Sequence, residues 1–261
     1  MSCPFAKAIL VLLLSVASLS PIQGADRYRV GDVLYVWAQS GLNLRKAPQL
    51  NAPKVDKLAM GVSVKVLAKT SQALRLAVIA ARPEQAAGNI FGEPASKDPF
   101  VLEGHWVKVQ SGATVGYVAD IYLLSWPALP EATTPWEYTE LLTEDQLIAD
   151  TTWLQGCEGG PAIDCYEWKA ASSTGIEFSG DVSLVSVYQG FRLPDMTVEE
   201  GFVFWNVFIP IGDAERRKAG LDPLTLLQGE EGNLWLLENE VCELSITLED
   251  DRIYCSSGCS D

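Results

Sequence analysis

Cysteine and histidine are the residue types in this chain best suited to catalysis or metal binding. Five of the six cysteines lie at positions 157, 165, 242, 255 and 259, and the sixth, Cys3, lies near the N-terminus; the single histidine, His105, belongs to the other half of the chain. A cysteine nucleophile normally needs a histidine base, and zinc sites use closely spaced cysteines and histidines. No C-x-x-C pair occurs. We therefore expect no catalytic residue, no metal and no other cofactor, and we expect His105 to be an exposed, inert residue at a strand edge.

Disulfide formation accounts better for four of these cysteines. If a hairpin turns at Asp250 and Asp251, Cys242 faces Cys259 and Ile246 faces Cys255. Directly opposed residues of antiparallel strands lie within disulfide range, so we predict a bond between Cys242 and Cys259. Cys157 and Cys165 flank a turn-prone Gly-Gly-Pro loop and are predicted to form the second pair. Cys255 is then left over, either buried or available for an intermolecular bond.

Carboxylates offer a second kind of chemistry, because acid/base hydrolysis of sugars uses paired Asp and Glu. Residues 126–261 contain 26 Asp or Glu against 6 Lys or Arg, whereas residues 26–125 contain 8 against 12. The net charges are therefore −20 and +4. Most of these acids are expected to be solvated surface, and so acidic a chain is not expected to bind nucleic acid. Docking of the basic half onto the acidic half is a further possibility at low salt.

The organisation along the chain follows from composition. Residues 1–24 have the Lys7, apolar and small-residue regions of a secretory signal, so the mature protein is expected to be secreted or periplasmic, with no membrane span. Residues 126–137 contain three prolines, which favour an extended linker. We therefore expect a signal peptide (1–24), an N-terminal domain (26–125), a Pro-rich linker (126–137) and an acidic, disulfide-containing β-domain (138–261).

Short strands dominate the expected N-terminal domain. Apolar and polar residues alternate through Leu42–Arg45 and Val62–Val66, and further strands are expected at 33–37, 106–109 and 115–118. Ser111 and Gly112 provide a tight turn between the last two. Strands of this length and spacing, without a long helix, favour a small barrel.

Four segments of this half, LNLRKAP, MGVSVKVL, HWVKV and VGYVADIYL, occur in the order typical of one family. Residues 30–124 resemble the bacterial SH3 domain, SH3b. The resemblance implies an SH3-like barrel in an extracellular or periplasmic protein that recognises peptidoglycan peptides or contacts other proteins. This half of the chain differs from the family by a long insertion, about residues 68–104. Within the insertion, Leu74–Ala81 is apolar enough for an extra strand. The insertion either extends the binding surface or covers the family's recognition groove.

Five residues of this half are the candidate ligand-binding set. Asn43 and Arg45 form either a binding pair or a structural pair that hydrogen-bonds the adjacent loop. Trp106, Tyr117 and Tyr122 either line an aromatic groove for a peptide or are partly buried in the barrel.

The expected C-terminal domain is mostly an antiparallel sheet, folded as a sandwich or open barrel, with one short helix. A capping box at Thr143–Gln146 predicts that helix over about 144–155, and Arg216–Gly220 suggests one more helical turn. Strands are expected at 182–188, 202–209, 234–237 and 241–248.

The fold class is thus mainly β, and two functions compete. The first is a non-catalytic envelope protein that binds a peptide, peptidoglycan or a protein partner. The alternative is a cell-wall hydrolase with a carboxylate-based site in the C-terminal domain.

Overall fold

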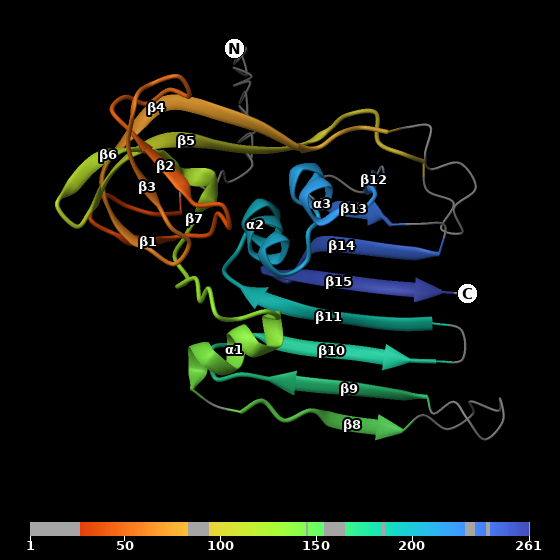
Figure 1. Ribbon diagram of the computed structural model, residues 1–261. Helices are drawn as coiled ribbons and strands as arrows, with labels where there is room; N and C mark the ends of the chain where they lie inside the picture. Colours follow the sequence, from red (N-terminus) through yellow and green to blue (C-terminus); the bar gives the residue numbers. More distant parts are fainter. Residues whose placement is uncertain are drawn as a thin grey trace, which may run out of the picture.

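A computed structural model describes residues 27–82, 94–144, 146–153, 165–183, 186–227, 233–238 and 241–260 (Figure 1). Residues 1–24, expected to be a signal peptide, and Cys157 lie outside these residues. Two antiparallel sheets, one of seven strands and one of eight, contain about half of the described residues. The mainly β class expected from the sequence is confirmed. Among the described residues, no helix is long and apolar enough to cross a membrane.

The seven-stranded sheet curls into a partly closed barrel (Figure 1). Its strand order is β3-β2-β6-β5-β4-β1-β7. Alternation of apolar and polar residues turns one face inward, where Leu44, Val66, Val107, Val109 and Val118 are fully buried. The strands are β1 (Val33–Val36), β2 (Leu42–Arg45), β3 (Lys54–Leu58), β4 (Ser63–Ile79), β5 (Phe100–Ser111), β6 (Thr114–Ala119) and β7 (Leu123–Leu124), with the short helix η3 (Asp120–Tyr122) before β7.

The insertion is an extension of two barrel strands. β4 continues beyond the barrel to Ile79 and pairs with β5 as far as Phe100, with register irregularities on the way. The strand expected at Leu74–Ala81 therefore exists up to Ile79, but as the continuation of β4. We call residues 69–79 with 100–107 the arm. In Figure 1 the arm leaves the barrel and runs over the helices of the C-terminal half.

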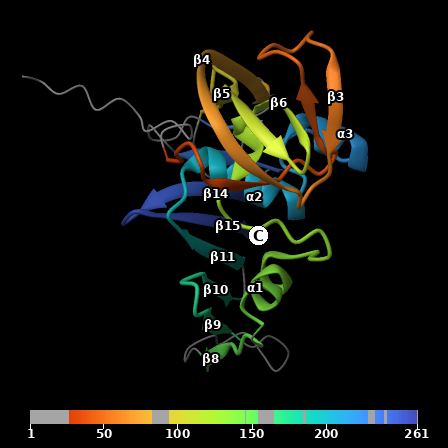
Figure 2. The same ribbon diagram turned by 90° about the vertical axis from the view of Figure 1, so that its left-hand side faces the viewer.

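The eight-stranded sheet is a single layer with helices on one face, not the expected sandwich or open barrel (Figures 1 and 2). Its order is β12-β13-β14-β15-β11-β10-β9-β8. The turn at Asp250 and Asp251 has positive φ at both residues, as the tightest hairpin turns require. The strands are β8 (Asp150–Trp153), β9 (Tyr166–Ala171), β10 (Glu177–Val182), β11 (Ser186–Pro194), β12 (Thr225–Leu226), β13 (Leu234–Leu237), β14 (Cys242–Glu249) and β15 (Arg252–Ser260).

Within the described residues, three α-helices, rather than the single one expected, accompany this sheet: α1 (Pro135–Thr143), α2 (Val198–Phe208) and α3 (Asp213–Ala219). The helix expected over 144–155 was wrong. Thr134 caps α1, with Pro135 at the first helical position, which proline tolerates. Glu144 is left-handed and ends the helix, and β8 follows. The turn expected from Arg216–Gly220 is present as the end of α3.

Helix α2 occupies residues that were expected to be a strand, 202–209. Thr197 and Glu200 form a capping box at its start, which satisfies backbone donors on both sides of the helix end. Both faces of α2 are buried, so its apolar run has no helical periodicity. At Gly201 a Cβ would lie 2.7 Å from Cγ2 of Ile253, so glycine lets α2 rest directly on β15. The strand expected at 182–188 was also misplaced, because β10 ends at Val182 and β11 begins at Ser186.

One hydrophobic cluster spans both halves, beside a second cluster that lies inside the barrel. Figure 2 shows α2 between the curled sheet and the eight-stranded sheet, and in Figure 1 α3 lies between the arm and the eight-stranded sheet. Trp37, Ile79 and Leu102 of the N-terminal half belong to the same buried cluster as the residues of α2. Phe100 of the arm packs on Phe202, with ring centroids 5.2 Å apart. The segment expected to be a Pro-rich linker also lies against this cluster, with Ala128 and Ala132 buried.

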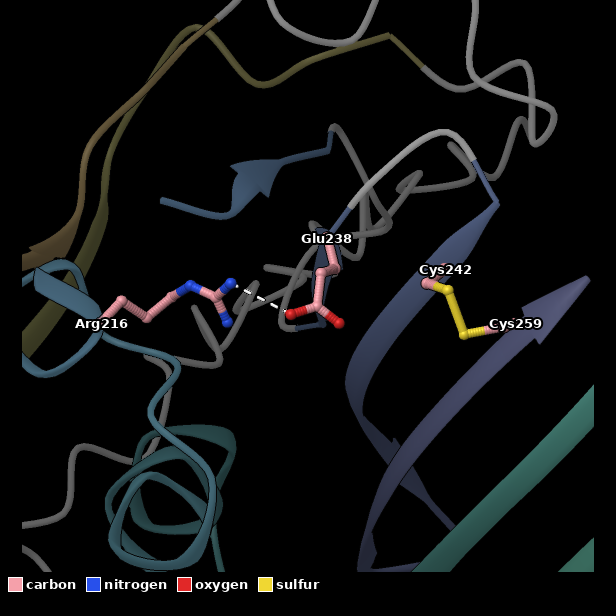
Figure 3. The surroundings of a disulfide bond; sticks show 4 residues. All are labelled: Arg216, Glu238, Cys242 and Cys259. Atoms are coloured by element: carbon pink, nitrogen blue, oxygen red, sulfur yellow. Dashed lines mark hydrogen bonds and ion pairs between the residues drawn. A yellow bond between two sulfur atoms is a disulfide. The ribbon is translucent and has the colours of Figure 1, made fainter. Parts of the chain in front are cut away.

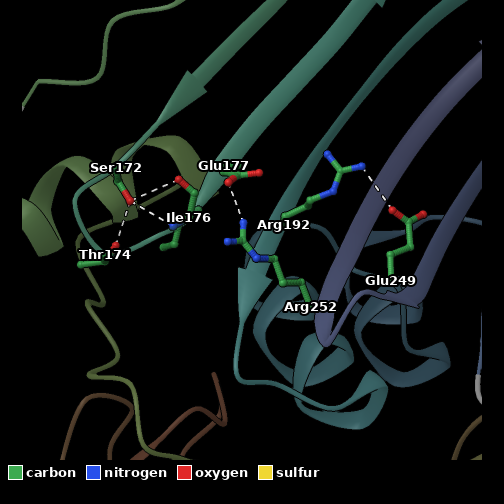
Figure 4. A network of polar contacts seen from close by, with 7 residues as sticks. All are labelled: Ser172, Thr174, Ile176, Glu177, Arg192, Glu249 and Arg252. Carbon is green, nitrogen blue, oxygen red and sulfur yellow. Dashed lines mark hydrogen bonds and ion pairs between the residues drawn. The ribbon is translucent and has the colours of Figure 1, made fainter.

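The face of the eight-stranded sheet that bears no helix is polar. Two ion pairs cross its strands, Arg252 with Glu177 at 2.6 Å and Arg192 with Glu249 at 3.2 Å (Figure 4). The Arg192 guanidinium also lies 4.5 Å from the centre of the Tyr254 ring. At the β9–β10 turn, the hydroxyl of Ser172 bonds both backbone groups of Ile176 (Figure 4). These contacts fix strand register on a solvated surface.

Candidate functional site

A cavity of about 200 Å³ lies where the barrel meets α2 and α3. Its barrel side is the loop between β1 and β2 together with Tyr122, and its other side is formed by α2 and by Glu215 of α3. Gly41 shapes the loop, because its φ of +76° is left-handed and a Cβ there would lie 2.8 Å from the Leu58 carbonyl oxygen. The lining residues are Trp37, Ala38, Gln39, Ser40, Gly41, Leu42, Asn43, Val78, Tyr122, Phe202, Val203, Asn206, Val207 and Glu215.

Hydrogen bonds hold the loop between β1 and β2 to both sides of the cavity. The backbone N–H of Trp37 donates to the carbonyl of Tyr122 at 2.9 Å, and its indole N–H donates to the carbonyl of Trp126 at 2.8 Å. The amide of Gln39 donates to the carbonyl of Val207, at the end of α2. Two of the candidate residues, Asn43 and Tyr122, therefore meet in a cavity whose shape depends on the C-terminal half.

The polar side chains that line this cavity differ in whether they are already hydrogen-bonded within the protein. Asn206 is occupied, since its side-chain oxygen accepts the backbone N–H groups of Ile211 and Gly212 at 2.9 and 2.8 Å. Within the described part of the chain, the side chains of Asn43 and Ser40 make no hydrogen bond. Burial and the nearby carboxylate of Glu215 raise the pKa of Tyr122. The cavity thus offers an amide, two hydroxyls and the carboxylate of Glu215, which also pairs with the exposed Lys218 at 3.5 Å.

Arg45 and Tyr117 lie together, but away from this cavity. They are opposite each other on β2 and β6, and both are half-buried. The Arg45 guanidinium donates to the carbonyl of Ala52 at 2.8 Å, which holds the loop between β2 and β3. This contact is the structural alternative raised for Arg45 in the sequence.

Trp106 is separate from the other four candidates. Only 4% of its surface is exposed, and it lies opposite Ala119 on β6. Its backbone carbonyl accepts the hydroxyl of Thr70 at 2.7 Å. Burial of this kind favours barrel packing over contact with a ligand.

His105 is half-buried, so the expectation of an exposed histidine was wrong. Its backbone N–H donates to Oδ1 of Asp120 at 2.6 Å, and the Tyr28 hydroxyl donates to Oδ2 at 2.8 Å. Burial raises the pKa of Asp120, while these hydrogen bonds and the charge of His105 oppose the rise. Nδ1 of His105 is buried without a hydrogen-bond partner in the described part of the chain. His105 lies in the middle of β5, opposite Ala73 of β4 and beside the buried Asp120, and not at a strand edge, which is why it is covered.

Carboxylates also gather around Asp120. Glu103, Glu199 and Glu200 share with it a cavity of about 20 Å³, which is room for roughly one water molecule and not for a sugar ring. Burial raises the pKa of Glu200 as well, but its side chain accepts the backbone N–H of Thr197 in the capping box and pairs with Arg27. In the described residues, no group of three or more His, Cys, Asp or Glu is arranged to hold a metal ion.

The cysteines of the last hairpin form a structural bond. Cys242 and Cys259 face each other on β14 and β15 and are joined by a disulfide, with a Cα–Cα distance of 4.0 Å (Figure 3). The predicted pairing and register are confirmed. Cys165 is also disulfide-bonded, but its predicted partner Cys157 lies outside the described residues. Cys255 is a free, buried thiol, and burial raises its pKa well above the ordinary value.

Arg216 anchors α3 beside this hairpin. Its side chain is 4% exposed and pairs with Glu238 at 3.0 Å (Figure 3). It also donates to the carbonyls of Asp222 and Pro210. Because its donors are occupied within the fold, Arg216 positions α3, and with it Glu215, at the cavity.

The N-terminal barrel can now be compared with known families. Residues 40–123 match the family model of the bacterial SH3 domain. The four sequence segments that suggested this family lie on β2, β4, β5 and β6 with η3, so the resemblance is confirmed for this part of the chain. Comparisons with curated proteins and with solved structures gave no match. We refer to residues 40–123 as the SH3 segment.

The sequence patterns did not identify the residues of α2 and α3 that line the cavity. Phe202, Val203 and Glu215 were assigned to a strand or to no site, because α2 has no helical periodicity. The capping box at Thr197 and Glu200 was the available signal for a helix at this position. No sequence signal placed that helix against the SH3 segment, since the contact spans more than half of the chain.

Proposed function

We propose that this protein is a non-catalytic binding protein of the bacterial cell envelope and that it binds a peptide of the cell wall. The observation that carries the proposal is a cavity on the SH3 segment with uncommitted polar groups. The family match supports a cell-wall role by analogy. The disulfide between Cys242 and Cys259 fits an extracytoplasmic setting.

The chemistry of the cavity favours a peptide that carries an amino group. Asn43 and Ser40 can exchange hydrogen bonds with peptide groups, while Glu215 supplies a negative charge. An ammonium group near a partly buried carboxylate gains more than it would in water, because screening is weaker there. Tyr122 gives the ligand an aromatic wall.

The proposed site needs both halves of the chain. Asn43 and Tyr122 come from the SH3 segment, whereas Glu215 comes from α3. The C-terminal half would therefore act as one wall of the binding site, which gives this otherwise unrecognised half a role in recognition.

Cosedimentation with purified cell-wall sacculi tests the proposal. We expect the mature protein to sediment with sacculi, and we expect Asn43→Ala and Glu215→Gln each to weaken binding by about 3- to 10-fold, the effect of one lost hydrogen bond or charge contact. Asn51→Ala and Glu131→Gln, at exposed positions away from the cavity, are the matched controls. Recovery of the unaltered protein entirely in the supernatant would count against wall binding. Equal binding by all four variants would count against this cavity.

A further inference from the structure

A second hollow, of about 330 Å³, lies between α1 and the end of α2, on the helix-bearing face of the eight-stranded sheet. Pockets of roughly 300–1,000 Å³ are the usual size for small ligands. Its walls are mainly aromatic, and none of the candidate residues from the SH3 segment reaches it. The lining residues are Thr133, Thr134, Pro135, Trp136, Trp168, Phe178, Gln189, Gly190, Phe191, Trp205, Phe208, Ile209, Cys255 and Ser257.

The aromatic walls are rigidly packed. Trp136 lies 5.1 Å from Phe178 and 6.0 Å from Trp168, measured between ring centroids. Phe191 and Trp205 meet edge to face at 5.7 Å. A Cβ at Gly180 would collide with the Trp168 indole, so glycine allows that ring to lie against the sheet. The half-buried Trp168 and Trp136 therefore have fixed positions before any ligand arrives.

Two polar side chains line the same hollow without partners. Gln189 on β11 and Ser257 on β15 are directly opposite each other. Neither side chain makes a hydrogen bond within the part of the chain that the structure describes. By contrast, Thr133 and Thr134 are committed to Glu137 at the start of α1. Gln189 is exposed and Ser257 is half-buried, so this amide and hydroxyl are open to solvent beside the aromatic walls.

We propose that this hollow binds one pyranose ring of a cell-wall glycan, an inference that rests on the proposed envelope function. A pyranose has two faces of C–H groups and a rim of hydroxyls. Its C–H faces suit the electron-rich faces of indole rings, and its rim can pair with Gln189 and Ser257. An acyl chain would fill the same space but would leave both polar groups without partners, which costs binding energy.

Tryptophan fluorescence gives a direct test, because Trp136, Trp168 and Trp205 all line the hollow. The probe is the soluble trisaccharide of N-acetylglucosamine, titrated into the full mature protein. We expect a saturable change in emission, with Kd raised about 3- to 10-fold by Gln189→Ala and by Ser257→Ala. Gln72→Ala, on the arm, and Ser179→Ala, on the other face of the sheet, are expected to leave Kd unchanged.

Further variants and ligands distinguish this site from the cavity of the SH3 segment. Gly180→Ala is expected to displace Trp168 and weaken sugar binding, whereas Asn43→Ala is expected to leave sugar binding intact. Sugar binding by a protein that fails to sediment with sacculi would support this site and contradict the proposed function. Sedimentation without a fluorescence response to the sugar would overturn the sugar site alone. A response to dodecanoate in place of the sugar, or an unchanged Kd in both pocket variants, would also overturn it.

Discussion

The Trp37 indole, at the end of β1, packs against Phe204 of α2 with ring centroids 5.0 Å apart. Trp37 is 1% exposed and also meets Tyr138 of α1 edge to face at 5.5 Å. One side chain of the N-terminal half thus lies in the core beneath two helices of the C-terminal half. The two sheets consequently depend on each other for stability.

Replacing Trp37 by alanine should destabilise both halves together. Truncation of a buried tryptophan typically costs about 3–5 kcal/mol, and the shared core should transmit that loss to both sheets. Urea unfolding followed by fluorescence and by far-UV circular dichroism should give one coincident transition at a lower midpoint. Leu50→Ala, at a position that is 66% exposed, is the control. Two separate transitions, only one of them shifted, would contradict a common core.

High salt should not separate the halves. Although their net charges are opposite, the contact between them is mainly apolar, and Arg27–Glu200 and Arg82–Asp213 are the ion pairs that join them within the described residues. Salt screens exposed charges but not apolar burial. The radius of gyration from small-angle scattering should be the same at low salt and at 1 M salt, to within about 1 Å. Expansion with rising salt would show that charge holds the halves together.

Removal of the Arg82 side chain should loosen the end of the arm near Ile79. The Arg82 guanidinium pairs with Asp213 of α3 at 2.6 Å and donates to the Leu224 carbonyl at 3.0 Å, while the Ala80 N–H donates to Asp213. Loss of these partly buried contacts should cost about 1–2 kcal/mol locally, which is roughly 5- to 30-fold faster amide exchange. Arg82→Ala should show this increase over residues 74–79 by hydrogen exchange.

A matched control lies on the same arm. Arg75 pairs with Glu103 at 2.8 Å, but its side chain is 71% exposed, and such surface pairs contribute little. Arg75→Ala should therefore leave the exchange of residues 74–79 nearly unchanged. Equal acceleration in both variants would mean that Arg82 has no special role.

Asp120 should make the protein less stable as the pH rises. Burial raises its folded-state pKa above the unfolded value, so the folded state binds more protons in the window between the two pKa values. The free energy of unfolding must then fall as the pH rises through that window. Asp120→Asn keeps an oxygen that can accept the His105 N–H. In urea unfolding series from pH 4 to pH 7, this variant should show a smaller decrease in the free energy of unfolding than the unaltered protein. Glu200, whose pKa is also raised, remains in both proteins. Parallel curves for the two proteins would rule out Asp120 as a source of the pH dependence.

The disulfide of the last hairpin should contribute to stability through its loop. Cys242 and Cys259 are 17 residues apart, and closing a loop of that length in the unfolded chain is worth roughly 3 kcal/mol. The double variant Cys242→Ser with Cys259→Ser should lose about that amount in urea unfolding. A reducing agent should then have a smaller effect on the double variant than on the unaltered protein. Undiminished stability of the double variant would contradict this contribution.

Local patterns in the sequence predicted local structure well. The Asp250–Asp251 turn fixed the register of β14 and β15, and with it the pairing of Cys242 with Cys259. Alternation predicted most of the barrel strands. The failures have physical causes: α1 is set by its cap at Thr134, and α2 is set by its cap and by burial on several sides, which leaves no simple period in the sequence. The capping box at Thr197 was visible, but the apolar run after it also suits a buried strand.

Contacts between distant segments could not be predicted. Asn43 and Tyr122 line a cavity of the SH3 segment, and their role in ligand binding stays a prediction. Glu215 could be placed there only once α3 was known to pack on the arm. Arg45 and Trp106 belonged to the expected set because of their residue types. The hydrogen bond of Arg45 and the burial of Trp106, which depend on the fold, favour the structural role considered for each.

The arm limits how this SH3 segment can be transplanted. A fragment cut after residue 125 would carry Trp37, Ile79 and Leu102 into water, although each is at most 1% exposed in the whole protein. Such a fragment would expose an apolar surface and should aggregate instead of behaving as an independent domain. Grafting the segment onto another protein would therefore require either the C-terminal half as well or an arm shortened to a tight turn.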